Sequence, residues 1–380
     1  MRKSICILGS TGSIGTSTLK LIAEYKNKYQ IETLTANVNI EKLAKQAIEF
    51  KAKNVVVADQ NRYIELKQLL SGYDIKIYAG NQGLLDLSSF KYDVCIVGIV
   101  GMIAIKPIMN AISNSKVVAI ANKESIVCAG KFIIREAKKH NTNIIPLDSE
   151  HNAIFQVLEE ENRDNIKKIV LTASGGPFLY TNAIDLLNVT PKRALEHPNW
   201  QMGDKISVDS ATMVNKGLEV IEACKIFNLN IDQVDAIVHP QSIIHGMIHY
   251  RDGSVLSQMA HHDMRTPISF CLEYPKRTKF NCKILDLTKI RELSFFPIDK
   301  RQFPLFFLAK EAYSEGEYST VAFNLANEIA VKNFLRGKIK FLDINTFIQK
   351  VLVSCPRSDL DSIDQILEYS SELMNIYDAI

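Results

Sequence analysis

The first 150 residues alternate short apolar runs with amphipathic stretches, and this alternation constrains the fold more than any other feature of the chain. The β-branched apolar runs predict strands, and the stretches between them have helical spacing. We expect strands at 4–8, 31–36, 54–58, 94–98, 116–121 and 143–147, and helices at 17–25, 40–50 and 124–140. Strands alternating with helices in this way form a parallel sheet covered on both faces. The sequence therefore predicts an α/β domain over residues 1–147.

A different pattern follows. Strands are predicted at 166–173, 235–239, 244–250 and 254–259, with a helix at 213–227 and a long polar loop between Ser174 and Asp209. These elements predict a central α+β domain over 148–274. Residues 275–303 have mixed character and are interpreted as a connecting segment. Helical periodicity at about 305–315, 319–335, 343–353 and 360–376 predicts a C-terminal helical bundle over 304–380.

Composition excludes several classes of protein. The 380 residues include 45 Lys and Arg against 42 Asp and Glu, a net charge of +3 that gives no reason to expect nucleic-acid binding. The longest apolar run, 94–105, is shorter than the roughly 20 residues of a membrane-spanning helix. The apolar run near the N-terminus breaks at Gly9, so we expect no signal or transit peptide. Seven cysteines without a C-x-x-C pair favour reduced thiols and a cytoplasmic protein.

A glycine-rich turn, Gly9-Ser-Thr-Gly12-Ser-Ile-Gly15, follows the first predicted strand and begins the first predicted helix. Glycines let backbone N–H groups approach a pyrophosphate at a helix N-terminus, as in Rossmann-like dinucleotide-binding domains. The spacing is G-x-x-G-x-x-G, and a tight turn with glycines needed only for packing is the alternative.

The end of the second predicted strand bears on the choice of dinucleotide. An NAD site usually has an acidic residue there, which binds the ribose 2′-hydroxyl. This chain has Asn37-Val38-Asn39 instead, and Lys42 and Lys45 follow. The absence of an acidic residue, together with the two nearby lysines, favours binding of the 2′-phosphate of NADP.

Acidic residues gather after the strand at 143–147. Asp148 and Glu150 are two residues apart, so on an extended segment both side chains point the same way. Such carboxylates suit Mg²⁺ or Mn²⁺, and Glu219 and Glu222 are candidates for a further ligand. The alternative is a helix beginning near Asn152, with Asp148 as its cap and Glu150 in its first turn.

A second polar group lies around the start of the helix at 213–227. Hydroxyl, amide and ammonium groups at a helix start suit a phosphate, although a capped helix with a solvated face explains each residue singly. These residues are Ser207, Ser210, Thr212, Asn215 and Lys216. The single tryptophan, Trp200, lies in the preceding loop with Met202 and is interpreted either as part of a lid or as a hydrophobic pin.

Long motifs in this chain resemble those of the 1-deoxy-D-xylulose 5-phosphate reductoisomerase family. They are GSTGSIG (9–15), ANKES (121–125), LDSEHNAIFQ (147–156), SGGPF (174–178), HPNWQMG (197–203), KISVDSATMVNKGLE (205–219), HPQSIIHGM (239–247) and the C-terminal LAKEAYSEGEYSTVAFNLANEIAV. The resemblance covers essentially the whole chain. It implies a homodimeric, NADPH- and metal-dependent enzyme of the non-mevalonate isoprenoid pathway, which converts 1-deoxy-D-xylulose 5-phosphate into 2-C-methyl-D-erythritol 4-phosphate.

The same resemblance implies roles for individual residues. Asp148, Glu150 and Glu219 hold Mg²⁺, Mn²⁺ or Co²⁺, and Glu222 is structural. Lys123 joins these three as a catalytic residue. The residues implied to bind substrate are Lys123, Ser149, Glu150, Ser174, His197, Trp200, Met202, Ser210, Asn215, Lys216 and Glu219. Those implied to line the nucleotide are Thr11, Gly12, Ser13, Ile14, Asn37, Val38, Asn39, Asn122, Glu124 and Gly203. Residues 174–204, the lid segment below, are expected to close over the site.

The chain departs from the family pattern at two positions. Asn37-Val38 replaces a glycine and a basic residue of many relatives, which weakens the expected 2′-phosphate contact. Asp204 places an acid near the end of the lid segment. Two other functions remain open from the residues alone, namely another NADP-linked dehydrogenase and a non-catalytic NADPH sensor.

Overall fold

The computed structural model describes residues 2–200 and 202–378, so that position 201 of the lid segment lies outside the described residues. The chain divides into two compact units. The first unit contains the residues up to Ser125 together with 131–152 and 263–283. The second contains 126–130, 153–262 and the residues from 284 onward.

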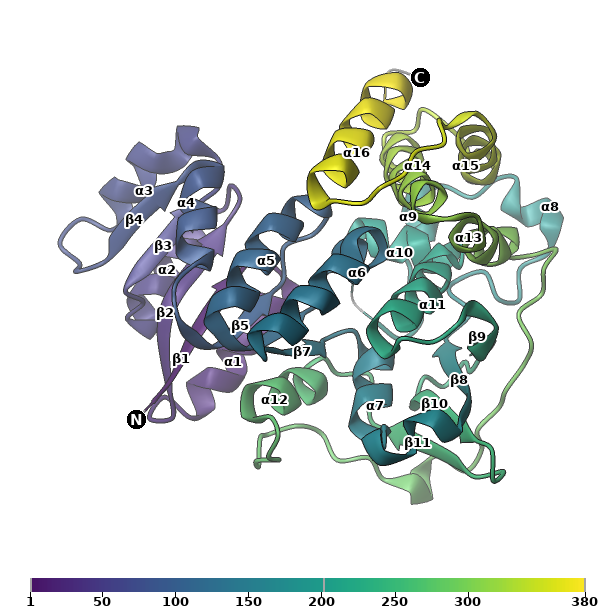
Figure 1. Ribbon diagram of the computed structural model, residues 1–380, viewed down its shortest axis with the longest axis horizontal. Coiled ribbons are helices and arrows are strands. Elements are labelled where there is room, and N and C mark those ends of the chain that lie inside the picture. The colour runs from purple at the N-terminus through teal and green to yellow at the C-terminus, as the bar shows by residue number, and fades with distance from the viewer. Residues whose placement is uncertain (1, 201, 379–380) are drawn as a thin grey trace. The chain divides into compact units, whose positions relative to one another are not determined.

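The first unit is built on a seven-stranded sheet in which all neighbouring pairs are parallel (Figure 1). The spatial order is β4-β3-β2-β1-β5-β6-β7. The strands are β1 Lys3–Leu8, β2 Tyr29–Ala36, β3 Asn54–Val57, β4 Lys76–Ala79, β5 Tyr92–Val97, β6 Ser115–Ile120 and β7 Asn143–Pro146. β3 is buried along its whole length and β1 and β5 along most of theirs, as expected for strands covered on both faces. The predicted α/β fold is confirmed.

The helices of this unit connect successive strands. They are α1 Ser13–Glu24, α2 Ile40–Phe50, α3 Tyr63–Leu69, α4 Gly80–Ser88, α5 Ile105–Asn114 and α6 Lys123–His140. A further helix, α12 Arg265–Glu273, comes from a distant part of the chain and packs on α1. Residues 126–130 of α6 belong to the second unit, and α7 Ser149–Val157 also begins in one unit and ends in the other. The sequence reading did not predict α3, α4, α5, α12 or β4. β4 has no fully buried residue, so its apolar pattern is weak.

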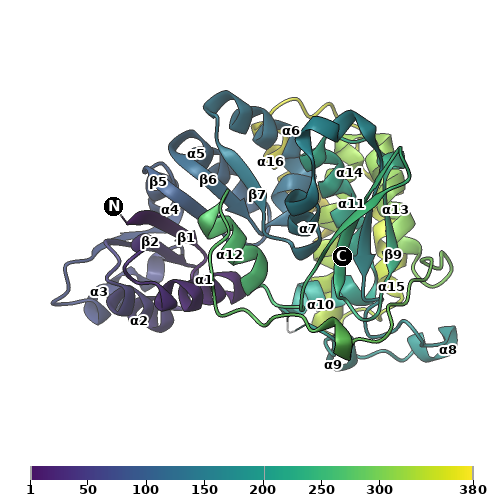
Figure 2. The same cartoon turned by 90° about the horizontal axis from the view of Figure 1, so that it is seen from below.

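The second unit contains a four-stranded sheet in the order β11-β10-β8-β9. Its strands are β8 Ile166–Ala173, β9 Val234–Val238, β10 Ile244–Tyr250 and β11 Val255–Met259. β10 is antiparallel to both β8 and β11, whereas β8 and β9 are parallel. One face packs on α11 Val214–Phe227 and α13 Pro304–Glu315, which lie alongside β9 in Figure 2.

The C-terminal helices form a bundle around α14, Glu317–Leu335, which contacts α13, α15 (Asp343–Ser354), α16 (Ile363–Tyr377) and α10 (Asp204–Ala211). All four predicted C-terminal helices are present, with ends that differ by a few residues from those expected. Between α12 and α13 the chain forms one short 3₁₀ turn, Leu287–Lys289, and an isolated bridge between Val238 and Phe296.

The long polar segment that follows β8 is less irregular than predicted. It contains the short helices α8 Ala183–Leu186 and α9 Pro191–Ala194, and it ends in α10, Asp204–Ala211. The expectation of a loop as far as Asp209 was therefore wrong. The α10 sequence, DKISVDSA, has no helical apolar stripe. Its buried Asp209 accepts hydrogen bonds from Lys205 and from Asn327, partners inside the protein that the local pattern does not reveal.

Two predictions about the whole chain concern cysteines and membranes. All seven cysteines are free, and five of them are buried, as expected for reduced core thiols. Among the described residues no helix has the length and apolar character needed to cross a membrane.

Candidate active site

The glycine-rich turn follows β1, and its glycines serve different purposes. Gly9 has φ +89°, and a Cβ there would lie 2.9 Å from the carbonyl group of Gly98. A Cβ on Gly15 would lie 2.4 Å from the Cα of Ser10. Gly12 is exposed and meets no such obstacle. Close packing therefore explains the first and last glycines, and only Gly12 leaves room for a ligand to approach the backbone.

Side chains of neighbouring elements hold this turn in place. The buried Ser10 Oγ donates to Gln46 Oε1 of α2 at 2.8 Å, and Gln46 Nε2 donates back to the Ser10 carbonyl at 3.0 Å. Lys42 Nζ donates to the carbonyl of Thr11 at 2.8 Å. The positive charge expected from the sequence near the nucleotide site thus lies directly on the turn. Beside Gly12, Ser13 is exposed and Ile14 is half-buried.

The segment after β2 is open to solvent. Asn37, Val38 and Asn39 are exposed, and the Asn39 side chain caps α2 by accepting from the Lys42 backbone N–H at 3.1 Å. Asn122 is buried and commits its amide to structure. Its oxygen accepts from the Ser125 N–H at 2.6 Å, and its nitrogen donates to the carbonyls of Ile99 and Gly101. Of the other residues expected at the nucleotide, Glu124 is buried in α6 and Gly203 is exposed in the second unit.

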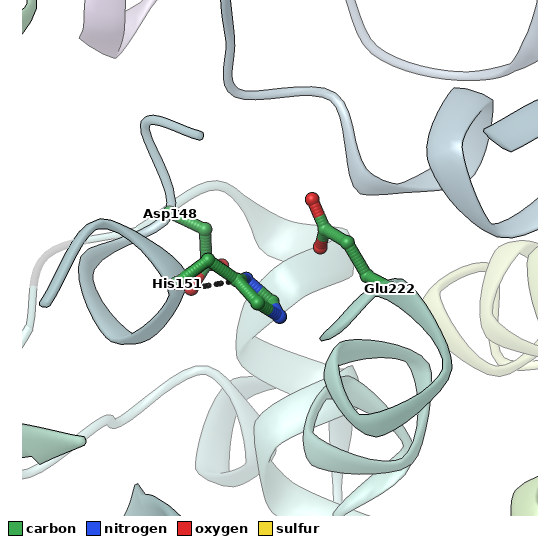
Figure 3. A group of neighbouring side chains, drawn as sticks. All are labelled: Asp148, His151 and Glu222. Atoms are coloured by element: carbon green, nitrogen blue, oxygen red, sulfur yellow. Dashed lines mark ion pairs between the residues drawn. The ribbon is translucent and has the colours of Figure 1, made fainter. Parts of the chain in front are cut away.

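Asp148 is the centre of a charged group in the first unit. Its Oδ2 lies 3.0 Å from Lys123 Nζ, and its Oδ1 lies 3.2 Å from His151 Nδ1 (Figure 3). Lys123 and His151 are both buried. A cation therefore already faces one Asp148 oxygen, and an imidazole orients the other.

The extended geometry expected for Asp148 and Glu150 was wrong. Helix α7 begins at Ser149, so Glu150 lies in its first turn, and the Glu150 N–H donates to Asp148 Oδ1 at 3.2 Å. The Ser149 hydroxyl donates to the Glu150 carboxylate. The capping alternative described this local geometry better, apart from the position where the helix begins. The two carboxylates nevertheless face one site as expected, because one oxygen of Asp148 and one of Glu150 lie within 4.8 Å of each other.

Glu219 is the corresponding charged residue in the second unit. It lies on α11, is 1% exposed, and accepts from both the Asn215 amide and the Lys216 ammonium group. The chain enters α11 through Met213, whose φ of 62° is left-handed. This turn ends α10 and places Asn215 and Lys216 in the first turn of the next helix. Glu222, also drawn in Figure 3, is one turn further along α11 and equally buried.

Ser174 and His197 are joined across the lid segment. Burial, assisted by the charge of His262, lowers the pKa of His197 to about 4, so its imidazole is neutral. Its Nδ1 accepts from the backbone N–H groups of Asn199 (3.2 Å) and Trp200 (2.9 Å). Nε2 therefore carries the proton and donates to Ser174 Oγ at 3.0 Å.

Ser174 consequently has one hydrogen to offer a ligand. Its Oγ accepts from His197 and also from the Gly176 N–H at 3.1 Å, which leaves its own hydroxyl hydrogen as a donor. Gly176 has φ +66°, and a Cβ there would lie 2.7 Å from the carbonyl oxygen of Ser210. The turn at 174–176 thus packs on the end of α10, which brings Ser174 towards Ser210.

The tip of the lid segment rests on the loop after β9 and on two histidines. Asn199 Nδ2 donates to the Pro240 carbonyl at 2.8 Å and to Ser242 Oγ at 2.9 Å. The Trp200 ring lies 6.2 Å from the His245 ring and 5.9 Å from the His262 ring, centre to centre. Met202 is half-buried.

The sequence reading missed the structural partners of these residues. His151, Asn199, His245 and His262 had no assigned role, because no ligand-like histidine spacing was present. For His151 a signal was available, because Asp148 and His151 have the i, i+3 spacing that brings side chains together once a helix is assigned. No local signal connects Trp200 to residues more than forty positions away.

Comparison with known proteins places the chain among relatives of similar length. The family model described as "1-deoxy-D-xylulose 5-phosphate reductoisomerase" matches residues 5–130, and models of C-terminal domains of that enzyme match 144–227 and 259–376. The reductoisomerase of Zymomonas mobilis is 44% identical over 97% of this chain and 95% of its own. That of Wolbachia pipientis wMel is 44% identical over 98% and 96%.

Solved structures agree with these sequence matches. A structure of the Z. mobilis enzyme in complex with NADPH has a TM-score of 0.94 at 41% identity, covering 100% of this chain and 99% of the other. A structure of DOX-P reductoisomerase in complex with NADPH, fosmidomycin and magnesium has a TM-score of 0.95 at 38% identity, covering 99% and 98%.

Proposed function

Because this chain belongs to the 1-deoxy-D-xylulose 5-phosphate reductoisomerase family, we propose that it converts 1-deoxy-D-xylulose 5-phosphate into 2-C-methyl-D-erythritol 4-phosphate, using NADPH and a divalent metal. The observation that carries this proposal is similarity at 44% identity over 97% of the chain. The function belongs to the non-mevalonate route to isoprenoids. Of the domains expected from the sequence, we propose 1–147 for the nucleotide and 148–274 for the metal and substrate, with 275–303 as a connection and 304–380 as a supporting bundle.

Asp148, Glu150 and Glu219 are proposed as the metal ligands. The donor set fits Mg²⁺, Mn²⁺ or Co²⁺, because it offers carboxylate oxygens and contains no thiolate. A bound divalent cation polarises the substrate oxygens and stabilises negative charge on them. Lys123, which faces Asp148, supplies a positive charge beside that carboxylate and is proposed as a catalytic residue.

The substrate phosphate is proposed to bind Ser174, Ser210, Asn215 and Lys216. These residues offer two hydroxyls, an amide and an ammonium group. The ammonium group can only donate hydrogen bonds, and the hydroxyl and amide groups readily donate to phosphate oxygens. Glu219 holds Asn215 and Lys216 at the start of α11, so both donors are oriented before a ligand arrives. Ser149, His197, Trp200 and Met202 are proposed to contact the carbon skeleton. Phosphate binding anchors that skeleton far from the reacting atoms.

Bound at the proposed nucleotide site, NADPH would supply the hydride that reduces the aldehyde formed when the carbon skeleton rearranges. A retro-aldol route and a ketol shift need the same side chains. His197 is held neutral by burial, so its Nδ1 can accept from the Trp200 N–H and hold this part of the lid segment in place. Its Nε2–H donates to Ser174 and so orients the Ser174 hydroxyl towards a ligand. Closure of the lid segment excludes water from the reacting atoms.

The proposed nucleotide site predicts a cofactor preference. It comprises Thr11, Gly12, Ser13 and Ile14 of the turn, Asn37, Val38 and Asn39 after β2, and Asn122, Glu124 and Gly203. No acid follows β2, and Lys42 lies on the turn, so NADPH should have a higher kcat/KM than NADH. Lys42→Met should reduce the ratio of the two values by about tenfold, the effect of roughly 1.4 kcal/mol. Equal kcat/KM values for the two cofactors in the unaltered protein would contradict the charge argument.

The lid assignment predicts a fluorescence change. Trp200 is the single tryptophan, so its emission reports on the lid segment alone. Emission should shift when inorganic phosphate and NADPH bind, because the indole moves into a drier environment. Trp200→Phe should lower kcat and raise the KM for substrate, by about tenfold in kcat/KM. If Trp200 is a static pin instead, its emission stays constant at saturating ligand, and the variant loses thermal stability with normal kinetics.

We also propose that the protein is a cytoplasmic homodimer. Seven free cysteines favour a reducing compartment. An open groove of about 490 Å³ is lined by the apolar residues Val170, Ile237, Met247 and Phe295 and by Lys167, Lys168 and His249. The apolar part of this groove supports pairing with a second copy. Mass measurement by light scattering tests the dimer.

One assay separates the proposed function from its rivals. Oxidation of NADPH is followed with 1-deoxy-D-xylulose 5-phosphate and Mg²⁺ or Mn²⁺, and the product is identified. Formation of the branched 2-C-methyl-D-erythritol 4-phosphate supports the proposal. Reduction without rearrangement indicates another NADP-linked dehydrogenase, and NADPH binding without turnover indicates a sensor.

A further inference from the structure

Helix α10 carries a proposed phosphate ligand but has little stability of its own. It has eight residues, about two turns, and helices of this length depend on tertiary contacts. Its Ser210 is proposed to bind the phosphate directly, and the Ser210 carbonyl is the surface on which Gly176 packs. Whatever fixes α10 therefore also fixes the turn at 174–176 and the hydroxyl of Ser174.

A buried carboxylate lies on the inner side of this helix. Asp209 is 1% exposed, and its two oxygens have different partners. One accepts from Lys205 Nζ at 2.8 Å, an i, i+4 pair that stays within α10 and cannot attach it to anything else. The other accepts from Asn327 Nδ2 at 2.7 Å, and Asn327 belongs to α14 of the C-terminal bundle. This second bond joins α10 to another element.

Asn327 occupies a position at which packing alone favours an apolar residue. It is 0% exposed, and α14 is buried along most of its length by the helices around it. An amide in such a place is costly unless it is hydrogen-bonded. Its bond to a carboxylate is charge-assisted and directional, whereas the apolar contacts of Val208 and Ala211 allow α10 to slide or rotate.

We propose that Asn327 and Asp209 are positioning residues for phosphate binding, through which the C-terminal bundle sets the place and rotation of α10. This inference rests on the proposed function, because it assumes that Ser210 and Ser174 bind the substrate phosphate. Neither Asn327 nor Asp209 touches the substrate. Loss of their bond moves two hydroxyl donors and leaves Lys216 and Glu219 on α11 in place.

The test replaces Asn327 by leucine, which is similar in size and cannot donate. The KM for 1-deoxy-D-xylulose 5-phosphate should rise at least fivefold, whereas kcat and the KM for NADPH should change less than twofold. The Ki of inorganic phosphate, used as a competitive inhibitor, should rise in parallel. A purely structural role lowers the melting temperature without this division between KM and kcat.

Asn324→Leu is the matched control. Asn324 is on the same helix and also 0% exposed, but its amide donates within α14, to Glu328 at 3.2 Å. It should lose thermal stability and keep its KM. Asp209→Leu removes the acceptor of the bond from Asn327, so its KM should rise as in Asn327→Leu. If Asn327→Leu does not fold, Asn327→Ser replaces it, with the same expected result.

Each contrary outcome is distinct. Unchanged KM in the Asn327 variant, or an equal rise in the Asn324 variant, overturns the positioning role. A KM in Asp209→Leu that stays within twofold of the value for the unaltered protein also overturns it. Failure of the unaltered protein to convert the substrate in this assay counts against the proposed function instead.

Discussion

Glu219→Gln is expected to lower kcat about a thousandfold, the equivalent of roughly 4 kcal/mol of lost transition-state stabilisation. The substitution keeps the size of the side chain and one acceptor oxygen, so glutamine can still accept from Asn215 or from Lys216, but not from both. It removes one of three negative charges proposed to hold the metal. The affinity for Mn²⁺, measured by calorimetry in the absence of substrate, should fall at least tenfold. Excess chelator should abolish turnover of the unaltered protein, and Mg²⁺ or Mn²⁺ should restore it.

Glu222→Gln provides the control for this substitution. Glu222 is on the same helix, three residues later, and is as buried as Glu219. Its replacement should lower the melting temperature while kcat and Mn²⁺ affinity change less than tenfold. Full activity of Glu219→Gln, or an equal loss in both variants, would remove Glu219 from the metal site and leave it as the buried counter-ion of Lys216.

The fold could largely be predicted because its strands are encoded locally. β1, β5 and β6 are short runs of buried apolar residues, and a run of this kind needs no partner to be recognised. Elements that depend on distant partners were missed. Helix α12 packs on α1 across some 240 positions of sequence, and α10 is stabilised by Asn327. The apolar periodicity of such elements is weak, because their polar side chains form hydrogen bonds inside the protein instead of facing water.

The sequence predicted which residue types make up the candidate site. It did not predict the backbone conformation or the orientation of the side chains there. Asp148 and Glu150 were identified as acids after a strand, but the extended conformation assumed for them is a helix start in the structure. Asn122 was expected at the nucleotide, and its amide proves to be occupied by the Ser125, Ile99 and Gly101 backbone. Spacing indicates which chemistry is available, whereas the orientation of each group depends on hydrogen bonds that form only on folding.

Lys216→Met is expected to raise the KM for substrate about a hundredfold, with a smaller fall in kcat. The lysine lies at the start of α11, and it is the single cation among the four residues proposed to bind the phosphate. Methionine keeps most of the side chain's volume and removes the charge. A charge-assisted hydrogen bond to a buried phosphate contributes roughly 2–3 kcal/mol, which corresponds to this change in KM. The Ki of inorganic phosphate should rise by a similar factor.

The chain offers an unusually close control in Lys225, nine residues further along α11. The side chains of both lysines are 4% exposed, and each forms an ion pair, Lys216 with Glu219 and Lys225 with Glu317. Removing either lysine takes the positive charge away from a carboxylate, so both variants should lose thermal stability. Only Lys216→Met should also lose the rise in melting temperature that inorganic phosphate gives the unaltered protein. If phosphate stabilises Lys216→Met as well as it stabilises Lys225→Met, Lys216 serves only to neutralise Glu219, and the phosphate binds elsewhere.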